Sequence, residues 1–184
     1  MSGIVIETAR LRLRSWRPED LDPFAEMCAD PIVMATLGPL MSREETAALI
    51  ERIDAIEQAN GYTAWALERR SDGRFIGWCG LIPGKFWPIE GNTEIGWRLA
   101  ADCWGQGYAT EAAHAATDWF FANLPDPSLW AITHTGNHRS RAVMERLGMT
   151  YRPELDFDHP RLAANDPLLR HVTYSLDRNA WRNL

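Results

Sequence analysis

The stretch EIGWRLAADCWGQGYATEA, residues 94–112, decides the fold of this chain of 184 residues. A strand over residues 93–99 leads into a short turn that carries Gly105 and Gly107, and a helix begins near Tyr108. The start of a helix has unpaired backbone N–H groups and a partial positive charge, and glycine lets a phosphate approach this backbone closely. The stretch therefore predicts a seat for an anion between a strand and a helix.

Other interpretations of this turn remain open at the level of the residues. Two glycines in a turn are also typical of a plain helix entry in a mixed sheet. A dinucleotide-binding fold would need a third glycine, and Thr110 stands at that position. The strand also follows a predicted hairpin instead of opening the chain, which further disfavours the dinucleotide fold.

The remaining elements complete a single domain over residues 1–184. Alternation of apolar and polar residues predicts a first strand over residues 4–16, with Leu11 and Leu13 on one face. The order β, α, α, β, β, β, α, β, α, β, β predicts an α/β (α+β mixed) fold, with a mostly antiparallel, mixed central sheet and helices on both faces. The other predicted strands cover residues 62–70, 74–82, 129–135, 150–155 and 169–176, and helices begin at Pro18, Ser42, Ala109 and Asn137.

Two of these helices carry clear end signals. Ser42 and Glu45 fit a capping box at the start of one. Asn137 is a good N-cap for the other, which Gly148 ends. These end signals are common in helices and by themselves do not indicate a functional site.

Composition narrows the function classes. The formal net charge of −6 argues against nucleic acid as a main partner, and it suits an amine-bearing substrate as well as plain solubility. Cys28, Cys79 and Cys103 lack the spacing of a zinc site, so we expect reduced thiols and no metal. No apolar run indicates a signal peptide or a membrane span, so we expect a cytoplasmic protein without a membrane partner.

Residues 94–112 and 137–149 together resemble the GNAT (Gcn5-related N-acetyltransferase) family. The first block is similar to the acetyl-CoA loop of that family, which has the form Q/R-x-x-G-x-G/A. The second is similar to its N-x-x-S…L-G-F/M segment. Trp104 replaces Gln or Arg, as it often does in the Rim-type branch, RimJ/RimL-like, which includes ribosomal-protein N-terminal acetyltransferases. The opening TARLRLR, residues 8–14, also resembles that branch.

The resemblance implies a GNAT fold with acetyl-CoA as the donor substrate. Backbone N–H groups of the loop would hold the pyrophosphate, and the strand before it would pair with the pantetheine arm. Asn137 would hydrogen-bond that arm, Ser140 would lie near the thioester sulfur, and Arg141 would either reach a phosphate or stay solvated. The implied cofactor-binding residues are Trp97, Arg98, Leu99, Trp104, Gly105, Gln106, Gly107, Tyr108, Ala109, Thr110, Asn137 and Arg141.

The chemistry leaves the general base open. Direct transfer in a ternary complex needs a neutral amine, a stabilised oxyanion and a departing thiolate. We expect Glu94 and Ser140 as the catalytic residues. The alternatives for the base are His134, His159, His171 and water.

The predicted activity is transfer of an acetyl group to a primary amine, either a peptide or protein N-terminus or a small molecule. The alternatives are a GNAT enzyme that uses another acyl-CoA donor and a catalytically inactive CoA-binding regulatory module. The chain would act as a monomer or a homodimer.

Overall fold

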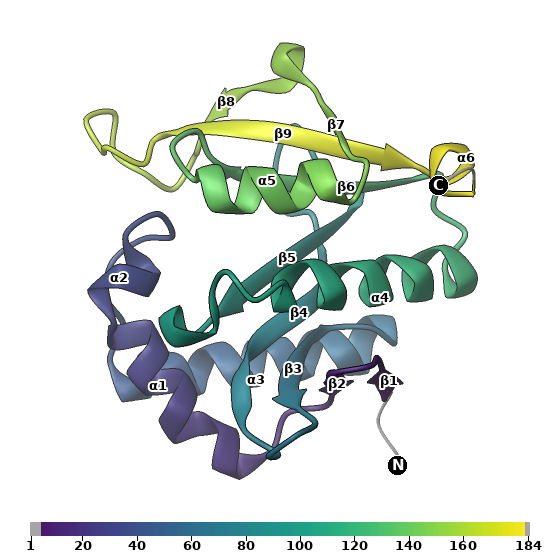
Figure 1. The fold of residues 1–184 in the computed structure, drawn as a ribbon. Helices are drawn as coiled ribbons and strands as arrows, with labels where there is room; N and C mark the ends of the chain where they lie inside the picture. The colour runs from purple at the N-terminus through teal and green to yellow at the C-terminus, as the bar shows by residue number, and fades with distance from the viewer. Residues whose placement is uncertain (1–4, 183–184) are drawn as a thin grey trace.

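The computed structural model describes residues 5–182, which form one sheet with helices on both faces (Figure 1). The described strands are β1 (Ile6–Glu7), β2 (Leu11–Arg14), β3 (Ala64–Arg69), β4 (Phe75–Pro83), β5 (Thr93–Leu99), β6 (Ser128–His134), β7 (Thr150–Tyr151), β8 (Phe157–Asp158) and β9 (Arg170–Asp177). The described helices are α1 (Leu21–Ala29), α2 (Pro31–Met34), α3 (Arg43–Asn60), α4 (Tyr108–Asn123), α5 (His138–Arg146) and α6 (Arg178–Trp181), with 3₁₀ helices η1 (Pro18–Asp20), η2 (Ala101–Cys103) and η3 (Pro153–Leu155).

The sheet confirms the predicted fold class. Its strand order is β1-β2-β3-β4-β5-β6-β9-β7, and β8 also pairs with β9. Within the described residues β5 and β6 run parallel, and every other neighbouring pair of strands is antiparallel. Figure 1 shows α4 in front of the sheet and α3 behind it.

Two apolar cores hold the helices against the two faces of the sheet. On one face, Leu11 of β2 belongs to a buried cluster with Phe120 of α4 and Leu147 next to α5. On the other face, Phe24 and Cys28 of α1 belong to a separate cluster that includes Ala66 of β3 and Phe75 of β4. The helices α4 and α5 therefore lie on the opposite side of the sheet from α1.

The first strand was predicted in one piece over residues 4–16, and this was wrong. The described part folds back on itself as the antiparallel pair β1 and β2, because the Thr8 backbone N–H donates to the Leu11 carbonyl at 2.9 Å. The predicted alternation still holds within β2, where Leu11 and Leu13 are fully buried. Residue 4 lies outside the described residues.

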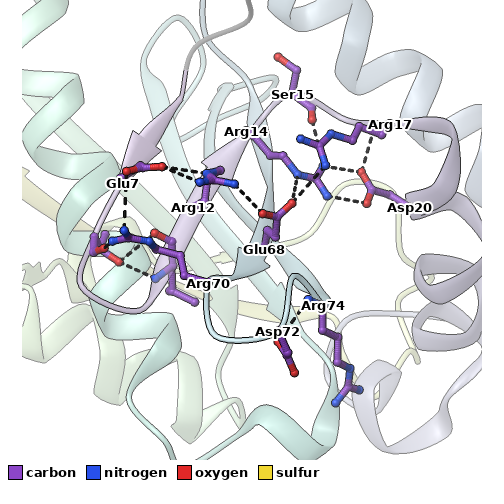
Figure 2. Close-up of polar contacts among 12 residues, drawn as sticks. Glu7, Arg12, Arg14, Ser15, Arg17, Asp20, Glu68, Arg70, Asp72 and Arg74 are labelled. Atoms are coloured by element: carbon purple, nitrogen blue, oxygen red, sulfur yellow. Dashed lines mark hydrogen bonds and ion pairs between the residues drawn. The ribbon is translucent and has the colours of Figure 1, made fainter.

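Arg14 of β2 is buried as well, and a network of ion pairs compensates its charge (Figure 2). Its guanidinium donates to Asp20 at 2.7 and 2.9 Å and to Glu68 at 2.8 Å. Burial alone would raise the pKa of Glu68, but the Arg14 hydrogen bond and the nearby arginines lower it. Because Asp20 ends η1, the network fixes the start of α1 against strands β2 and β3.

The C-terminal part is more broken than the sequence indicated. The strand predicted over residues 150–155 ends after Tyr151, and Pro153 instead opens η3, since proline removes a backbone donor and favours the first position of a helix. Strand β6 pairs with β9 along its whole length, from Ser128↔Asp177 to His134↔His171. The short elements β8 and α6 were not predicted.

Candidate active site

The sheet splits between its two parallel strands. Strands β5 and β6 pair only at Thr93↔Leu129 and Glu94↔Trp130, although β5 continues to Leu99. Beyond Glu94, the edge of β5 that faces β6 has no strand partner. A cavity of about 1070 Å³ lies along this free part of β5 and is also lined by residues of α2, the loop before α4, and α5.

The glycine loop forms one end of this cavity. Gly105 and Gly107 have φ angles of 74° and 81°, a region that residues with a Cβ avoid. Gly107 is the N-cap of α4, and because it has no side chain it leaves the N–H groups of the first turn uncapped. Tyr108, Ala109 and Thr110 of that turn line the cavity. The structure therefore has an uncapped helix start at the cavity, which is the geometry that the predicted anion seat requires.

Arg10 and Glu111 brace this loop from outside. The Glu111 carboxylate accepts from the Arg10 backbone at 2.9 Å, from its Nε at 2.6 Å and from Thr8 Oγ1 at 2.6 Å. Arg10 Nη1 donates in turn to the Gln106 carbonyl at 2.8 Å. Burial would raise the pKa of Glu111, but these hydrogen bonds lower it, so the carboxylate stays ionised. The N-terminal motif and the glycine loop thus form one structural unit.

The cavity carries positive charge in an otherwise acidic protein. Arg98, Arg139 and Arg146 line it, and none of them forms an ion pair with a described carboxylate. The acidic residue that lines it, Glu111, is neutralised by Arg10. The Arg139 guanidinium lies 4.4 Å from the ring centre of Trp104. Such a cavity fits a ligand with several phosphates.

The second motif lies on the opposite wall. Asn137 is buried and caps α5, since its Oδ1 accepts from the Ser140 N–H at 3.2 Å and its Nδ2 donates to Thr133 Oγ1 at 3.0 Å. One Nδ2 hydrogen and one lone pair of Oδ1 remain available to a ligand. Ser140 also lines the cavity, and its hydroxyl makes no hydrogen bond with another described residue.

Arg141 is not on the cavity side of α5. Its side chain donates to Tyr174 Oη and to the Thr135 carbonyl, both at 3.2 Å, and lies over the ring of Tyr151. The expectation that it reaches a phosphate therefore fails in this structure, and Arg139 and Arg146 occupy the positions that face the cavity.

Glu94 lies at the last paired position before the split, on the sheet face that carries α1. It is partly buried, and burial raises its pKa to about 8. Its carboxyl makes no hydrogen bond with another described residue. Glu94 is not among the residues that line the cavity.

Three of the predicted candidate bases gather elsewhere. The ring centres of His159 and His171 are 4.8 Å apart, and those of His134 and His171 are 6.4 Å apart, next to Phe157. Burial lowers the pKa of His159 and of His171, so both rings are neutral near neutral pH. None of the three lines the cavity.

Most of the predicted cofactor residues come together. Eleven of the predicted site residues line the cavity, namely Trp97, Arg98, Leu99, Trp104, Gly105, Gly107, Tyr108, Ala109, Thr110, Asn137 and Ser140. Gln106 contributes to the loop but points its amide to the Asp102 carbonyl.

Sequence reasoning missed one wall of the cavity and its basic groups. The missed residues include Ile32, Val33, Leu37, His114, Arg139 and Arg146. The sequence Asp30-Pro31 ends α1. It is also a helix start, because the Asp30 side chain accepts from the Ile32 N–H at 2.8 Å and proline suits the first helical position.

Two further features of the described residues bear on metals and membranes. Among residues 5–182, no group of three or more His, Cys, Asp or Glu side chains could hold a metal ion. Cys28, Cys79 and Cys103 are buried free thiols, and burial raises the pKa of Cys79. None of the described helices has both the length and the apolar character to cross a membrane.

Comparison with known proteins agrees with this geometry. Residues 10–150 match the family model of the acetyltransferase (GNAT) domain. An uncharacterized protein of Bacillus subtilis, YkkB, is 34% identical over 147 residues, which cover 78% of this chain and 84% of the relative.

Solved structures share the whole fold. An acetyltransferase from Agrobacterium tumefaciens is 28% identical with a TM-score of 0.77, covering 96% of this chain and 95% of the other. RimL, a ribosomal L7/L12 α-N-protein acetyltransferase in complex with coenzyme A, has a TM-score of 0.77 at 17% identity, covering 96% and 99% of the two chains, and shows likeness of fold alone. The glycine loop, the split sheet and these matches lead to one conclusion: the chain belongs to the GNAT acetyltransferase family and is an acyl-CoA-dependent N-acetyltransferase.

Proposed function

We propose that this protein transfers an acetyl group from acetyl-CoA to the primary amine of a peptide N-terminus or a small molecule, by direct transfer in a ternary complex. The observation that carries the proposal is the single cavity that joins an uncapped helix start and unpaired arginines to the free edge of β5. The proposal also places the chain near the Rim-type branch, on the sequence Trp104-Gly105-Gln106-Gly107.

The donor would lie with its phosphates at the start of α4. The N–H groups of residues 105–110 and the side chains of Arg139 and Arg146 supply hydrogen-bond donors and positive charge there. The pantetheine arm would follow residues 97–99, where β6 no longer pairs with β5, in the manner of an added strand. Asn137 would offer its remaining Nδ2 hydrogen to the arm.

Transfer would need a base, an oxyanion site and help for the leaving thiolate. The amine nitrogen attacks the thioester carbonyl, the C–S bond breaks, and the backbone N–H near Trp97 stabilises the oxyanion. Glu94, whose pKa of about 8 is close to that of an α-amine, would take the proton through water. The Ser140 hydroxyl, which has no internal partner, would donate to the thiolate.

The test is release of free CoA thiol from acetyl-CoA across a panel of N-terminal peptides, amino acids, polyamines and aminoglycosides. We expect release that depends on the acceptor and an acetylated amine detectable by mass spectrometry. Tight binding of CoA without release for any amine would contradict catalysis and favour a binding module. Faster release from a longer acyl-CoA would contradict acetyl as the transferred group.

A further inference from the structure

Arg98 has an unusual environment for a partly buried cation. Its guanidinium extends from β5 toward α1, where Nη1 donates to Cys28 Sγ at 3.0 Å and the charge lies 5.8 Å from the ring centre of Phe24. Its Nε is buried and has no hydrogen-bond partner. No described carboxylate lies within ion-pair distance of it, although Arg98 lines the cavity.

Arg14, which is more deeply buried, shows how this protein compensates a buried cation. Its guanidinium makes four hydrogen bonds, to the Asp20 and Glu68 carboxylates and to the Ser15 carbonyl. Leaving a buried charge without a counter-charge is costly, so unpaired cations in cavities are candidate ligand sites. Arg98 therefore has the capacity to bind an anion that the protein itself does not supply.

Trp78 adds a second unused donor on the same face of the sheet. It is the register partner of Arg98 on β4, and its buried Nε1–H also has no partner. Its ring lies over Gly96, where a Cβ would come within 3.2 Å of it. Adjacent strands thus carry two buried N–H groups without an acceptor among the described residues, and of these two residues Arg98 lines the cavity.

An anion bound to Arg98 would lie in a different part of the cavity from the phosphates of the donor. Helices α4 and α5 lie on the opposite face of the sheet, and Trp104 of the glycine loop packs against both clusters, whereas the Arg98 side chain lies on the face of α1 and α2. On that face the cavity wall is apolar: Ile32 and Leu37 line it and are 63% and 40% exposed, and Val33 lies beside them. On the face of α1 and α2, the cavity therefore combines one unpaired cation with an apolar wall.

We propose that the acceptor is a free α-amino acid with an apolar side chain, whose carboxylate binds Arg98 and whose side chain packs against α2. This rests on the proposed function and narrows its acceptor. In the reaction a C–N bond forms at the acetyl carbon as the C–S bond breaks. The amine proton goes to the base and the thiolate takes a proton, which yields an N-acetyl amino acid and CoA.

The test compares three acceptors that share the leucine side chain: L-leucine, which has the carboxylate, L-leucinamide, in which it is an amide, and 3-methylbutylamine, which lacks it. We expect kcat/KM for leucine to exceed that for either neutral analogue by roughly ten- to a hundredfold, the range of a hydrogen-bonded charge pair. Arg98→Gln should remove this preference, and Arg98→Lys should retain part of it. Arg43→Gln removes the same charge from an exposed pair with Asp22 and should leave the preference intact.

A second measurement needs no turnover. In calorimetry on the CoA-loaded protein, N-acetyl-L-leucine should bind more tightly than N-acetyl-L-leucinamide by a similar factor, and Arg98→Gln or Arg98→Lys should reduce the difference. Equal kcat/KM or equal affinity for acid and amide in the wild type would overturn the proposal. So would an unchanged preference in a folded Arg98→Gln protein. Transfer to amides or peptides as fast as to leucine would leave the acetyltransferase activity standing and remove only the carboxylate site.

Discussion

Replacing Glu94 by glutamine tests the proposed base, because the two side chains have nearly the same shape. A positioned general base contributes roughly 10²- to 10⁴-fold, so kcat/KM should fall within that range. With a pKa of about 8, roughly one tenth of the Glu94 carboxyls are ionised at about pH 7 and roughly nine tenths at about pH 9. The ratio of wild-type to variant rates should therefore rise about tenfold between these values. The acceptor's own titration is common to both proteins and cancels in the ratio.

The same substitution has a separate effect on stability. The folded pKa of Glu94 is raised from 4.5 to about 8 by burial, so the folded state favours the neutral carboxyl. Its contribution to stability is fully present below about pH 4.5 and is lost as the pH rises through about 8. Glutamine cannot ionise, so the melting temperature of Glu94→Gln should decline less than that of the wild type across this interval.

The assay measures thiol release against pH for the wild type, Glu94→Gln and Glu90→Gln. Glu90 is exposed in the loop before β5 and serves as the matched control, with no expected change in rate. A wild-type-to-variant ratio that stays flat with pH would refute the role of Glu94 as the base. A lower rate together with unchanged pH dependence of stability would refute the raised pKa itself.

Three further substitutions test the donor site. Gly107→Val should weaken acetyl-CoA binding, measured by calorimetry, because the φ of Gly107 is 81° and a Cβ there would lie 3.4 Å from an Arg10 nitrogen. The control is Gly73→Val, which strains a turn with open space around it and should leave the affinity for acetyl-CoA unchanged. Ser140→Ala should lower kcat roughly ten- to a hundredfold with acetyl-CoA affinity nearly intact, and a wild-type kcat would exclude its role toward the thiolate. Asn137→Ala should raise the acetyl-CoA KM and also remove about 1 kcal/mol of stability with its cap; lost stability at an unchanged KM would leave it as a cap alone.

Much of the cofactor site could be predicted because its signals are local. A strand, two glycines and a helix within residues 93–123 define their own geometry, and the glycines meet a backbone requirement that the structure confirms with positive φ angles. The capping box of Ser42 and Glu45 is present for the same reason, since both partners lie within one helical turn. Sequence patterns whose partners lie within a few residues can be interpreted without knowing which other elements pack against them.

The basic residues of the cavity could not be assigned in this way. Arg139 and Arg146 lie about two turns apart on α5 and share one face, whereas Arg141 lies about half a turn away. Helical periodicity separates the two sets but does not say which set meets the cavity. The packing of α5 on strands β6 and β9 decides this, and it turns Arg141 toward Tyr174.

The sequence by itself therefore determined the fold class, the family and the glycine turn that opens α4, where we expect the anion. Tertiary structure alone decided the rest, because it depends on contacts between distant segments. The N-terminal strand folds into a hairpin that braces the glycine loop through Arg10 and Glu111, about a hundred residues apart in the chain. The wall of α2 and the unpaired charge of Arg98 likewise arise only where β5, α1 and α2 meet, since a sequence does not show which cation lacks a partner.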